Sequence, residues 1–433
     1  VDLVEKPEAA AFTWGAVNGR EDQLTYLAGV QHFRQLGLVG SGGNNLVNRT
    51  AVFAGRRTND EVRPFNIIAE DSYQYGLRTK FSLSKYLGFF RGEIDLGGEL
   101  FWEDYDQELF ETLDGGEQGA AIGGRIENHF YYFAFAQWQR QWSEQWTTEA
   151  SFNLRASRYQ LATSIDRDFN FSPFYLPSFS LYYNASDAVQ VHGRINRGIS
   201  QPDVSAAVEN SLTNSEPLRP SYGWNQELGI QWQSENRSAS LTAFRMNVED
   251  ALVTRMDDQG VPFFFNGGSA IHQGIEAQLN YAWKTGVDSR LLLSSNYTLA
   301  DYTFKDFIDD SNNFSGNQIP GITPNRWQNR LSWQAKRLQL SATLDIAGEQ
   351  FVDDANTTTA DGYTLLHARV AYDIIPKGKV LQIYAGISNL LDEAYVSMVQ
   401  INARGFGGNL PRSFYPGQPR FFYFGMNYGL DYR

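Results

Sequence analysis

The sequence predicts an all-β fold, a transmembrane antiparallel β-barrel of the up-and-down type with about 16–17 strands. Two patterns in the 433 residues predict this fold. Apolar and polar residues alternate with a period of two, and short turns alternate with long connections. A third observation argues against a helical membrane protein, because no apolar run approaches the roughly 18 residues that a transmembrane helix requires.

The period of two is clearest in residues 338–347. The even-numbered positions carry Leu, Leu, Ala, Leu and Ile, whereas the odd-numbered positions carry Gln, Ser, Thr, Asp and Ala. Residues 146–156, 381–388 and 422–430 show related alternation. Such a strand has one apolar and one polar face. In a membrane barrel the apolar face contacts lipid and the polar face lines the lumen.

The lengths of the connections favour a barrel over a soluble sandwich. Short turns recur about every 40–50 residues, and Gly-, Asn- and Asp-rich connections lie between them, as in barrels with short periplasmic turns and long outer loops. The predicted short turns are 142–146, 184–188, 234–238, 284–288, 334–338 and 376–379. The predicted long connections are 37–71, 106–125, 201–223, 257–268, 305–325, 351–361 and 392–419.

The strand count predicts that the chain is part of a longer barrel. Eight hairpins and a last strand near residues 420–430 give about seventeen strands, whereas bacterial single-chain barrels have even counts. The chain begins at Val1 without Met and without a charged-then-apolar leader. We therefore interpret residues 1–433 as one barrel domain from which upstream strands are missing.

Charge and cysteine content exclude several classes of function. The net charge of −13 argues against a nucleic-acid partner, which requires a basic surface. The absence of cysteine removes disulfide scaffolds, thiolate metal sites and thiol catalysis.

Six short motifs follow one another in the order found in TonB-dependent outer-membrane receptors, and through them the chain resembles that family. Residues 389–395 (NLLDEAY) are similar to the family's asparagine-leucine-x-aspartate-x-x-tyrosine end of the penultimate strand. Residues 415–420 (YPGQPR) are similar to its proline-glycine-x-proline-arginine entry to the closing strand. The other motifs lie at 197–202, 218–229, 266–276 and 319–329. We interpret the motifs chiefly as barrel-building elements, with Asn389 and Asp392 capping backbone groups after a strand ends.

The resemblance implies a receptor in the cell outer membrane of a Gram-negative bacterium that imports a large, scarce substrate with energy delivered by TonB. A ferric-siderophore complex is the expected substrate, with cobalamin, copper, haem and oligosaccharide as alternatives. Family barrels have about 22 strands and an N-terminal plug, so we expect the plug and about five strands to be absent here. TonB would act through that missing part. Outer-membrane lipid and lipopolysaccharide are expected neighbours, and we expect a monomer.

Two other functions fit parts of the pattern. A passive porin, complete at about sixteen strands, would need an inward-folded constriction loop with opposed charges, and we identify none. A soluble carbohydrate-binding β-protein would lack an aromatic girdle at a membrane interface. Tryptophans here fall next to predicted periplasmic turns, namely Trp138, Trp142, Trp146, Trp283 and Trp333.

Candidate ligand contacts lie in the predicted outer loops. Loop Phe side chains either pack into a canopy or line a ligand mouth, and both interpretations remain open. Arg side chains near the mouth would offer charge-assisted contacts to an anionic ligand. The candidate residues are Arg255, Phe263, Phe264, Phe265, Tyr302, Arg404 and Arg412.

No catalytic constellation is present in the sequence, so we predict a transport protein that is not an enzyme and has no cofactor or resident metal. The acidic residues at 306–310 and at 353–354 lack the spacing of a calcium loop and are interpreted as solvated. No two histidines have zinc-site spacing; they are His32, His129, His192, His272 and His367.

Overall fold

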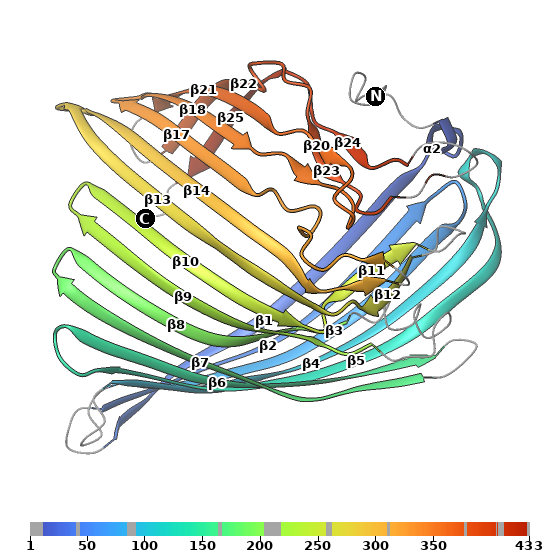
Figure 1. The fold of residues 1–433 in the computed structure, drawn as a ribbon, viewed down its shortest axis with the longest axis horizontal. Helices are drawn as coiled ribbons and strands as arrows, with labels where there is room; N and C mark the ends of the chain where they lie inside the picture. Colours follow the sequence, from blue (N-terminus) through green and yellow to red (C-terminus); the bar gives the residue numbers. More distant parts are fainter. Residues whose placement is uncertain are drawn as a thin grey trace. The chain divides into compact units, whose positions relative to one another are not determined.

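The computed structural model describes residues 12–39, 44–84, 92–162, 167–202, 218–256, 262–309, 312–375, 379–403, 405 and 411–430. These residues are almost entirely β-strand (Figure 1). The chain divides into an N-terminal unit, Ala9–Leu181, and a C-terminal unit that contains Tyr182–Arg433.

The N-terminal unit consists of long strands in which each pairs antiparallel with the next along the chain from β1 to β6. Figure 1 shows β1 to β5 side by side in this order. The elements are α2 (Phe12–Ala16), β1 (Arg20–Val39), β2 (Asn44–Val62), β3 (Ile67–Ser84), β4 (Glu93–Thr112), η1 (Asp114–Gly116), β5 (Gln118–Gln141), β6 (Trp146–Ala162) and β7 (Arg167–Ser186), whose last residues belong to the C-terminal unit.

The C-terminal unit continues the same antiparallel pattern. Its main strands are β8 (Val189–Ser200), β9 (Ser221–Ser234), β10 (Arg237–Glu249), β13 (Ser269–Gly286), β14 (Ser289–Asp306), β17 (Asn325–Ala335), β18 (Leu338–Ala347), β21 (Tyr363–Ile375), β22 (Lys379–Ser388) and β25 (Phe421–Leu430). Short hairpins within the connections pair β11 (Leu252–Met256) with β12 (Pro262–Asn266), β15 (Ile308–Asp309) with β16 (Asn312–Asn313), β19 (Gln350–Phe351) with β20 (Thr359–Ala360), and β23 (Val396–Val399) with β24 (Phe414–Pro416). In Figure 1 the tight turns of this unit lie on the left, and β11, β12, β20, β23 and β24 lie toward the other end of the strands.

Seventeen of the strands belong to the main antiparallel sheet, which confirms the predicted fold class and strand count. The predicted short turns are confirmed at 142–145, 235–236, 287–288 and 336–337. Residues 376–378 lie outside the described part of the chain, but the strands on either side of them, β21 and β22, are antiparallel neighbours.

Two of the predicted long connections are wrong. Residues 37–71 contain the whole of β2, and only residues 63–66 separate β2 from β3. Most of residues 106–125 belongs to β4 and β5, which continue pairing to Thr112 and Gln118. These strand ends are polar and therefore resemble loops in sequence. Their polar side chains bind across the ladder instead, as in the Arg56 guanidinium, which donates to both oxygens of Asp71 at 3.0 and 2.8 Å.

The strands of the C-terminal unit present one apolar and one polar face, as the alternation predicted. Leu291, Trp333, Leu340 and Val370 pair in register across four neighbouring strands and form one row of the apolar face. One position along the strands, Arg290 pairs with Gln334 on the polar face, and the Arg290 guanidinium donates to the side-chain oxygen of Gln334. Because successive residues point to opposite faces of a strand, this register fixes the two surfaces along the whole unit.

The motif at 389–395 fastens the end of β22 to the entry of β25. The Asn389 side chain is buried, donates to the carbonyls of Glu393 and Gln418 at 2.8 and 3.1 Å, and accepts from the Glu393 amide at 2.9 Å. Asp392 accepts from the backbone and the guanidinium of Arg420. The predicted capping of local backbone groups is therefore confirmed for Asn389, whereas the backbone group that Asp392 caps belongs to Arg420, 28 residues away.

A second motif asparagine, Asn266, positions the β11–β12 hairpin. Its side chain accepts from the Arg219 amide and donates to the Arg219 carbonyl, each at 2.8 Å, so the amide imitates a paired strand residue. It also donates to the Asp250 carbonyl at 2.9 Å. The base of the hairpin is thus fixed to the segments before β9 and after β10.

Side chains also join the connections that follow β14, β18 and β22. The side-chain amide of Asn356 accepts from the backbone N–H of Gln318 at 2.8 Å and donates to its carbonyl at 2.9 Å. The Asn402 side chain donates to the Asp354 carboxylate and accepts from the Asp354 amide, each at 3.1 Å. Because Asp354 is buried, its interpretation as a solvated residue is wrong. We call these joined segments, 314–324, 351–361 and 400–402, the loop clasp.

Asp353 orders the turn within the loop clasp. Its carboxylate accepts from the amides of Thr357 and Thr358, at 2.9 and 2.7 Å, and from the Thr357 hydroxyl at 3.1 Å. Burial alone would raise the pKa of Asp353, but these donors stabilise the charged form, and the pKa lies below its ordinary value.

Replacement of Asn389 tests its structural role. We expect Asn389→Ala to lower the free energy of unfolding by about 1–3 kcal/mol, because buried backbone groups lose their partners. A denaturant titration of the detergent-refolded protein measures this. Asn427→Ala is the control, because Asn427 is exposed and makes one long hydrogen bond of 3.4 Å to Gln382. Equal losses in the two variants would contradict the assignment.

The lowered pKa of Asp353 predicts how the loop clasp responds to pH. A depressed folded-state pKa stabilises the turn fully above the ordinary aspartate pKa of about 3.9 and loses that contribution as pH falls through the folded value. We therefore expect hydrogen exchange at Thr357 and Thr358, corrected for its intrinsic pH dependence, to stay slow from pH 7 to about pH 4 and to accelerate below that. Asp353→Asn should accelerate it already at pH 7, whereas Asp361→Asn, at an exposed position of the same connection, should not.

Candidate functional site

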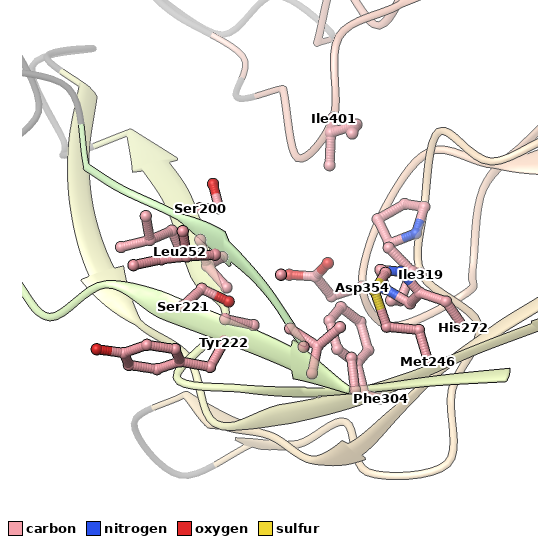
Figure 2. A pocket seen from close by; sticks show the side chains of 18 of the residues that line it. Ser200, Ser221, Tyr222, Met246, Leu252, His272, Phe304, Ile319, Asp354 and Ile401 are labelled. Carbon is pink, nitrogen blue, oxygen red and sulfur yellow. The ribbon is translucent and has the colours of Figure 1, made fainter. Parts of the chain in front are cut away.

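A pocket of about 610 Å³ lies at the end of the strands away from the tight turns, within the C-terminal unit. Figure 2 shows it from close by. Strands β8, β9, β10, β13 and β14 supply one part of its lining, and the β11–β12 hairpin and the loop clasp supply the rest. The volume is within the range of about 300–1,000 Å³ typical of small-molecule sites.

The pocket residues on β10, β13 and β14 share the polar face, which becomes apolar toward this end. On β10 that face carries Ser238, Ser240 and Thr242 near the tight turn but Met246 and Val248 at the pocket. The neighbouring strands change in the same way. Register places Met246 opposite His272 on β13 and Ala270 opposite Phe304 on β14, so the apolar ends coincide. Three adjacent strands therefore build a local apolar surface on an otherwise polar face.

Aromatic stacking holds the polar groups of this surface. The His272 ring stacks on Tyr302 with centroids 4.4 Å apart and planes 10° apart. Phe244 meets Tyr302 edge to face at 6.4 Å. Arg197 lies over the Tyr222 ring at 4.3 Å on the opposite face of the strands, since Tyr222 pairs with Glu249 whereas Met246 pairs with Asn225. In Figure 2 His272 and Met246 lie on one side of the pocket, and Ser200, Ser221 and Tyr222 lie on the other.

The loop clasp places Asp354, Ile319 and Ile401 at the pocket. Asp354 is fixed there by Asn402, and its carbonyl accepts from the side chain of Asn317 at 2.8 Å. Ile401 is partly exposed and points into the pocket from the clasp segment 400–402 (Figure 2). Displacement of one clasp segment would therefore alter the pocket.

The chemistry of the pocket is that of reversible binding. Most of its described lining is aliphatic or aromatic, and Ser200, Ser221, His272, Asp354 and Asn402 provide polar groups. No Lys or Arg occurs among the described lining residues. Within the described ranges, no three His, Asp or Glu side chains are arranged to hold a metal ion. The arrangement suits the apolar part of a ligand, oriented by a few hydrogen bonds.

The residues predicted to contact the ligand lie in different places in the structure. Phe265 stacks on the buried Phe307 at 6.2 Å, and Phe307 also contacts Phe304 and Phe314, so Phe265 packs into the canopy. Tyr302 supports the pocket through His272. Arg412 is exposed and is not part of the pocket lining. Arg404 and the side chains of Arg255, Phe263 and Phe264 lie outside the described part of the structure, although the backbones of the last three belong to the β11–β12 hairpin.

Sequence reasoning missed Tyr222, Met246, His272, Asp354 and Ile401 as pocket residues. A signal for Met246 and His272 was present, because the polar face of β10 and β13 becomes apolar at one end. No comparable signal identifies Asp354 or Ile401, whose positions depend on hydrogen bonds between connections distant in sequence.

Comparison with known proteins identifies the family. The family model described as TonB dependent receptor-like, beta-barrel matches residues 6–390. The ferrichrome outer membrane transporter and phage receptor of Escherichia coli is 26% identical over 184 residues, which cover 41% of this chain and 24% of that protein. The vitamin B12 transporter of Photobacterium profundum is 22% identical over 360 residues, covering 81% and 52%. None of the helices in the described residues is long and apolar enough to cross a membrane.

Solved structures agree on the fold. The unliganded ferric citrate transporter superposes with a TM-score of 0.72 at 16% identity, covering 95% of this chain and 62% of that one. The ferric-catecholate import receptor of Escherichia coli gives a TM-score of 0.70 at 13% identity, covering 96% and 65%.

The chain spans about a quarter to a half of the length of the curated relatives named above and less than two thirds of these two structures. The family match extends over more than half of the chain, and its members are outer-membrane transport receptors of Gram-negative bacteria, not enzymes. The chain therefore belongs to the TonB-dependent receptor family, whose β-barrel model its residues 6–390 match.

Proposed function

We propose that this barrel, residues 1–433, is part of a monomeric receptor that imports a ferric-siderophore complex with energy from TonB. The observation that carries the proposal is the pocket of about 610 Å³ on the inner face beneath the outer connections. A transported ligand that enters from outside would meet this surface before reaching the periplasm. Binding and release need no covalent step, which agrees with the reversible chemistry of the lining.

The lining favours a particular way of holding the complex. Ferric siderophores are bulky and contain organic arms around the metal, so Met246, Phe304 and Leu252 would pack against those arms while Asp354 and His272 orient polar groups. The iron in such a complex belongs to the substrate. The protein therefore needs no metal ligands of its own.

The loop clasp offers a route by which binding affects the outer surface. Its segments share hydrogen bonds and also place Asp354, Ile319 and Ile401 at the pocket. A ligand that prefers one arrangement of these residues would shift the whole clasp, because a ligand changes a conformational equilibrium by its difference in affinity for the two states. TonB would act through the N-terminal part of the complete receptor.

Uptake by cells tests the proposal. The complete gene is expressed in a strain that lacks its own iron receptors, with and without TonB, and accumulation of radiolabelled iron is measured with a tris-hydroxamate, a tris-catecholate and citrate as chelators. We expect TonB-dependent accumulation from at least one complex. Accumulation without TonB would indicate a passive porin. Failure with all iron complexes, together with uptake of cobalamin or copper, would replace the substrate class.

Pocket variants test the site. We expect Ser200→Trp to raise the concentration for half-maximal uptake about tenfold, because the indole occupies the pocket, a loss of about 1.4 kcal/mol in binding. Arg412→Ala is the comparison, since Arg412 lies on the surface outside the pocket lining. If Arg412→Ala impairs uptake and Ser200→Trp does not, ligand contact lies at the predicted arginine instead. Surface expression is checked by the heat-dependent gel migration of the folded barrel.

A further inference from the structure

The apolar face of the C-terminal unit carries a shallow groove of about 510 Å³. Ala342, Ala368 and Ala385 form its floor, and Trp333, Leu340 and Val370 are among the larger side chains around it. Ladder pairing brings these residues together, since Ala342 pairs with Ala368 and Val370 pairs with Ala385. Ala342 and Ala368 lie opposite each other, and Ala385 lies diagonally next to Ala368 on the third strand, so these small side chains leave an indentation in a surface of large side chains.

The groove lies in the part of the wall next to the periplasm. The turn at 336–337 is one of the short turns, which face the periplasm in barrels of this type. From Leu338 to Ala342 is four residues, about 14 Å of strand at about 3.4 Å per residue. One leaflet occupies about half of the roughly 30 Å hydrocarbon layer, or about 15 Å. The groove therefore faces the periplasmic leaflet of the outer membrane.

Two cations lie at the membrane edge below the groove. Lys336 and Arg337 occupy the turn and are both exposed. The Arg337 guanidinium donates to the Ile374 carbonyl at 3.4 Å, which places it at the end of β21, the strand that contributes Ala368 and Val370. Tyr372, between Val370 and Ile374 on the same face, is also exposed. A tyrosine beside cations at a strand end is typical of the boundary between hydrocarbon and head groups.

Apolar contact alone would not select one lipid, because lipid tails are as apolar as the Leu side chains that they contact. A fixed lipid needs a polar anchor as well. Guanidinium groups form charge-assisted and often bidentate hydrogen bonds with phosphate. The hydrogen bond to the Ile374 carbonyl uses one of the five N–H donors of Arg337. The neighbouring turn contains the acidic residue Asp288, whose backbone carbonyl accepts from the Lys336 amide.

We propose that this groove and its basic edge hold one anionic phospholipid of the periplasmic leaflet, with an acyl chain over the alanine floor and the phosphate against Arg337 and Lys336. This lipid-binding site depends on the outer-membrane location of the barrel and is independent of the substrate that is imported. It adds a lipid site to the outer wall, on the face opposite the ligand pocket.

Native mass spectrometry of the complete receptor tests the proposed lipid-binding site. The purified receptor is exchanged into mild detergent with equal amounts of phosphatidylglycerol and phosphatidylcholine, and retained lipids are counted. One test variant combines Ala342→Leu with Ala368→Leu and fills the groove with larger side chains. The other, Arg337→Gln, removes the cation that would bind the phosphate. Matched controls are Ala277→Leu, on the apolar face of β13 outside the groove, and Arg290→Gln, a cation at the same end of the strands whose side chain bonds Gln334 on the polar face.

We expect the unmodified receptor to retain one phosphatidylglycerol, with a preference of at least about tenfold over phosphatidylcholine. Both test variants should retain about tenfold less phosphatidylglycerol, whereas both controls should retain as much as the unmodified receptor. Unchanged retention in the test variants, or an equal loss in the controls, would overturn the proposal and indicate ordinary boundary lipid. If the floor variant does not fold, Arg337→Gln decides the question alone, because it alters an exposed turn residue.

Discussion

A strand that crosses a lipid layer must find a partner for every backbone N–H and C=O group, because hydrocarbon provides none. This constraint organises the described structure. Pairing of neighbours is unbroken over long stretches, as in β2 and β3, where every position from Asn45 to Val62 has a partner. Departures from regular pairing occur near strand ends, such as Ser269 to Ala270 in β13. Once the ladder is fixed, register determines which side chains meet lipid, and both the ligand pocket and the lipid groove are consequences of that register.

The two faces use the same ladder for different purposes. On the inner face, three adjacent strands change from polar to apolar at the same height, and His272, Met246 and Phe304 become one surface. On the outer face, alanines of adjacent strands align and leave room for a lipid chain. In the strands, both surfaces follow from side-chain size and polarity placed in register.

The sequence predicted the strands wherever apolar residues alternate strictly, and residues 338–347 coincide with β18. It failed for β2, where Arg56, Asn59 and Asp60 suggested a loop. In that strand polar groups find partners across the ladder, for example Asn59 with Glu70, and such pairing cannot be read from one segment. The capping role of Asn389 was predictable because one of its partners, Glu393, lies only four residues away. The pocket was not, because Asp354 and Ile401 reach it through contacts between connections more than forty residues apart.

The paired extensions of β4 and β5 have a consequence for how the outer surface is recognised from outside the cell. A strand needs about 9–11 residues to cross the hydrocarbon layer, whereas β4 has 20 and β5 has 24. The residues beyond the bilayer remain hydrogen-bonded as a stiff ribbon. An antibody or a phage protein that binds there meets side chains from two strands fixed at β-sheet spacing, so its epitope is conformational. A linear peptide copied from either strand alone would not reproduce it.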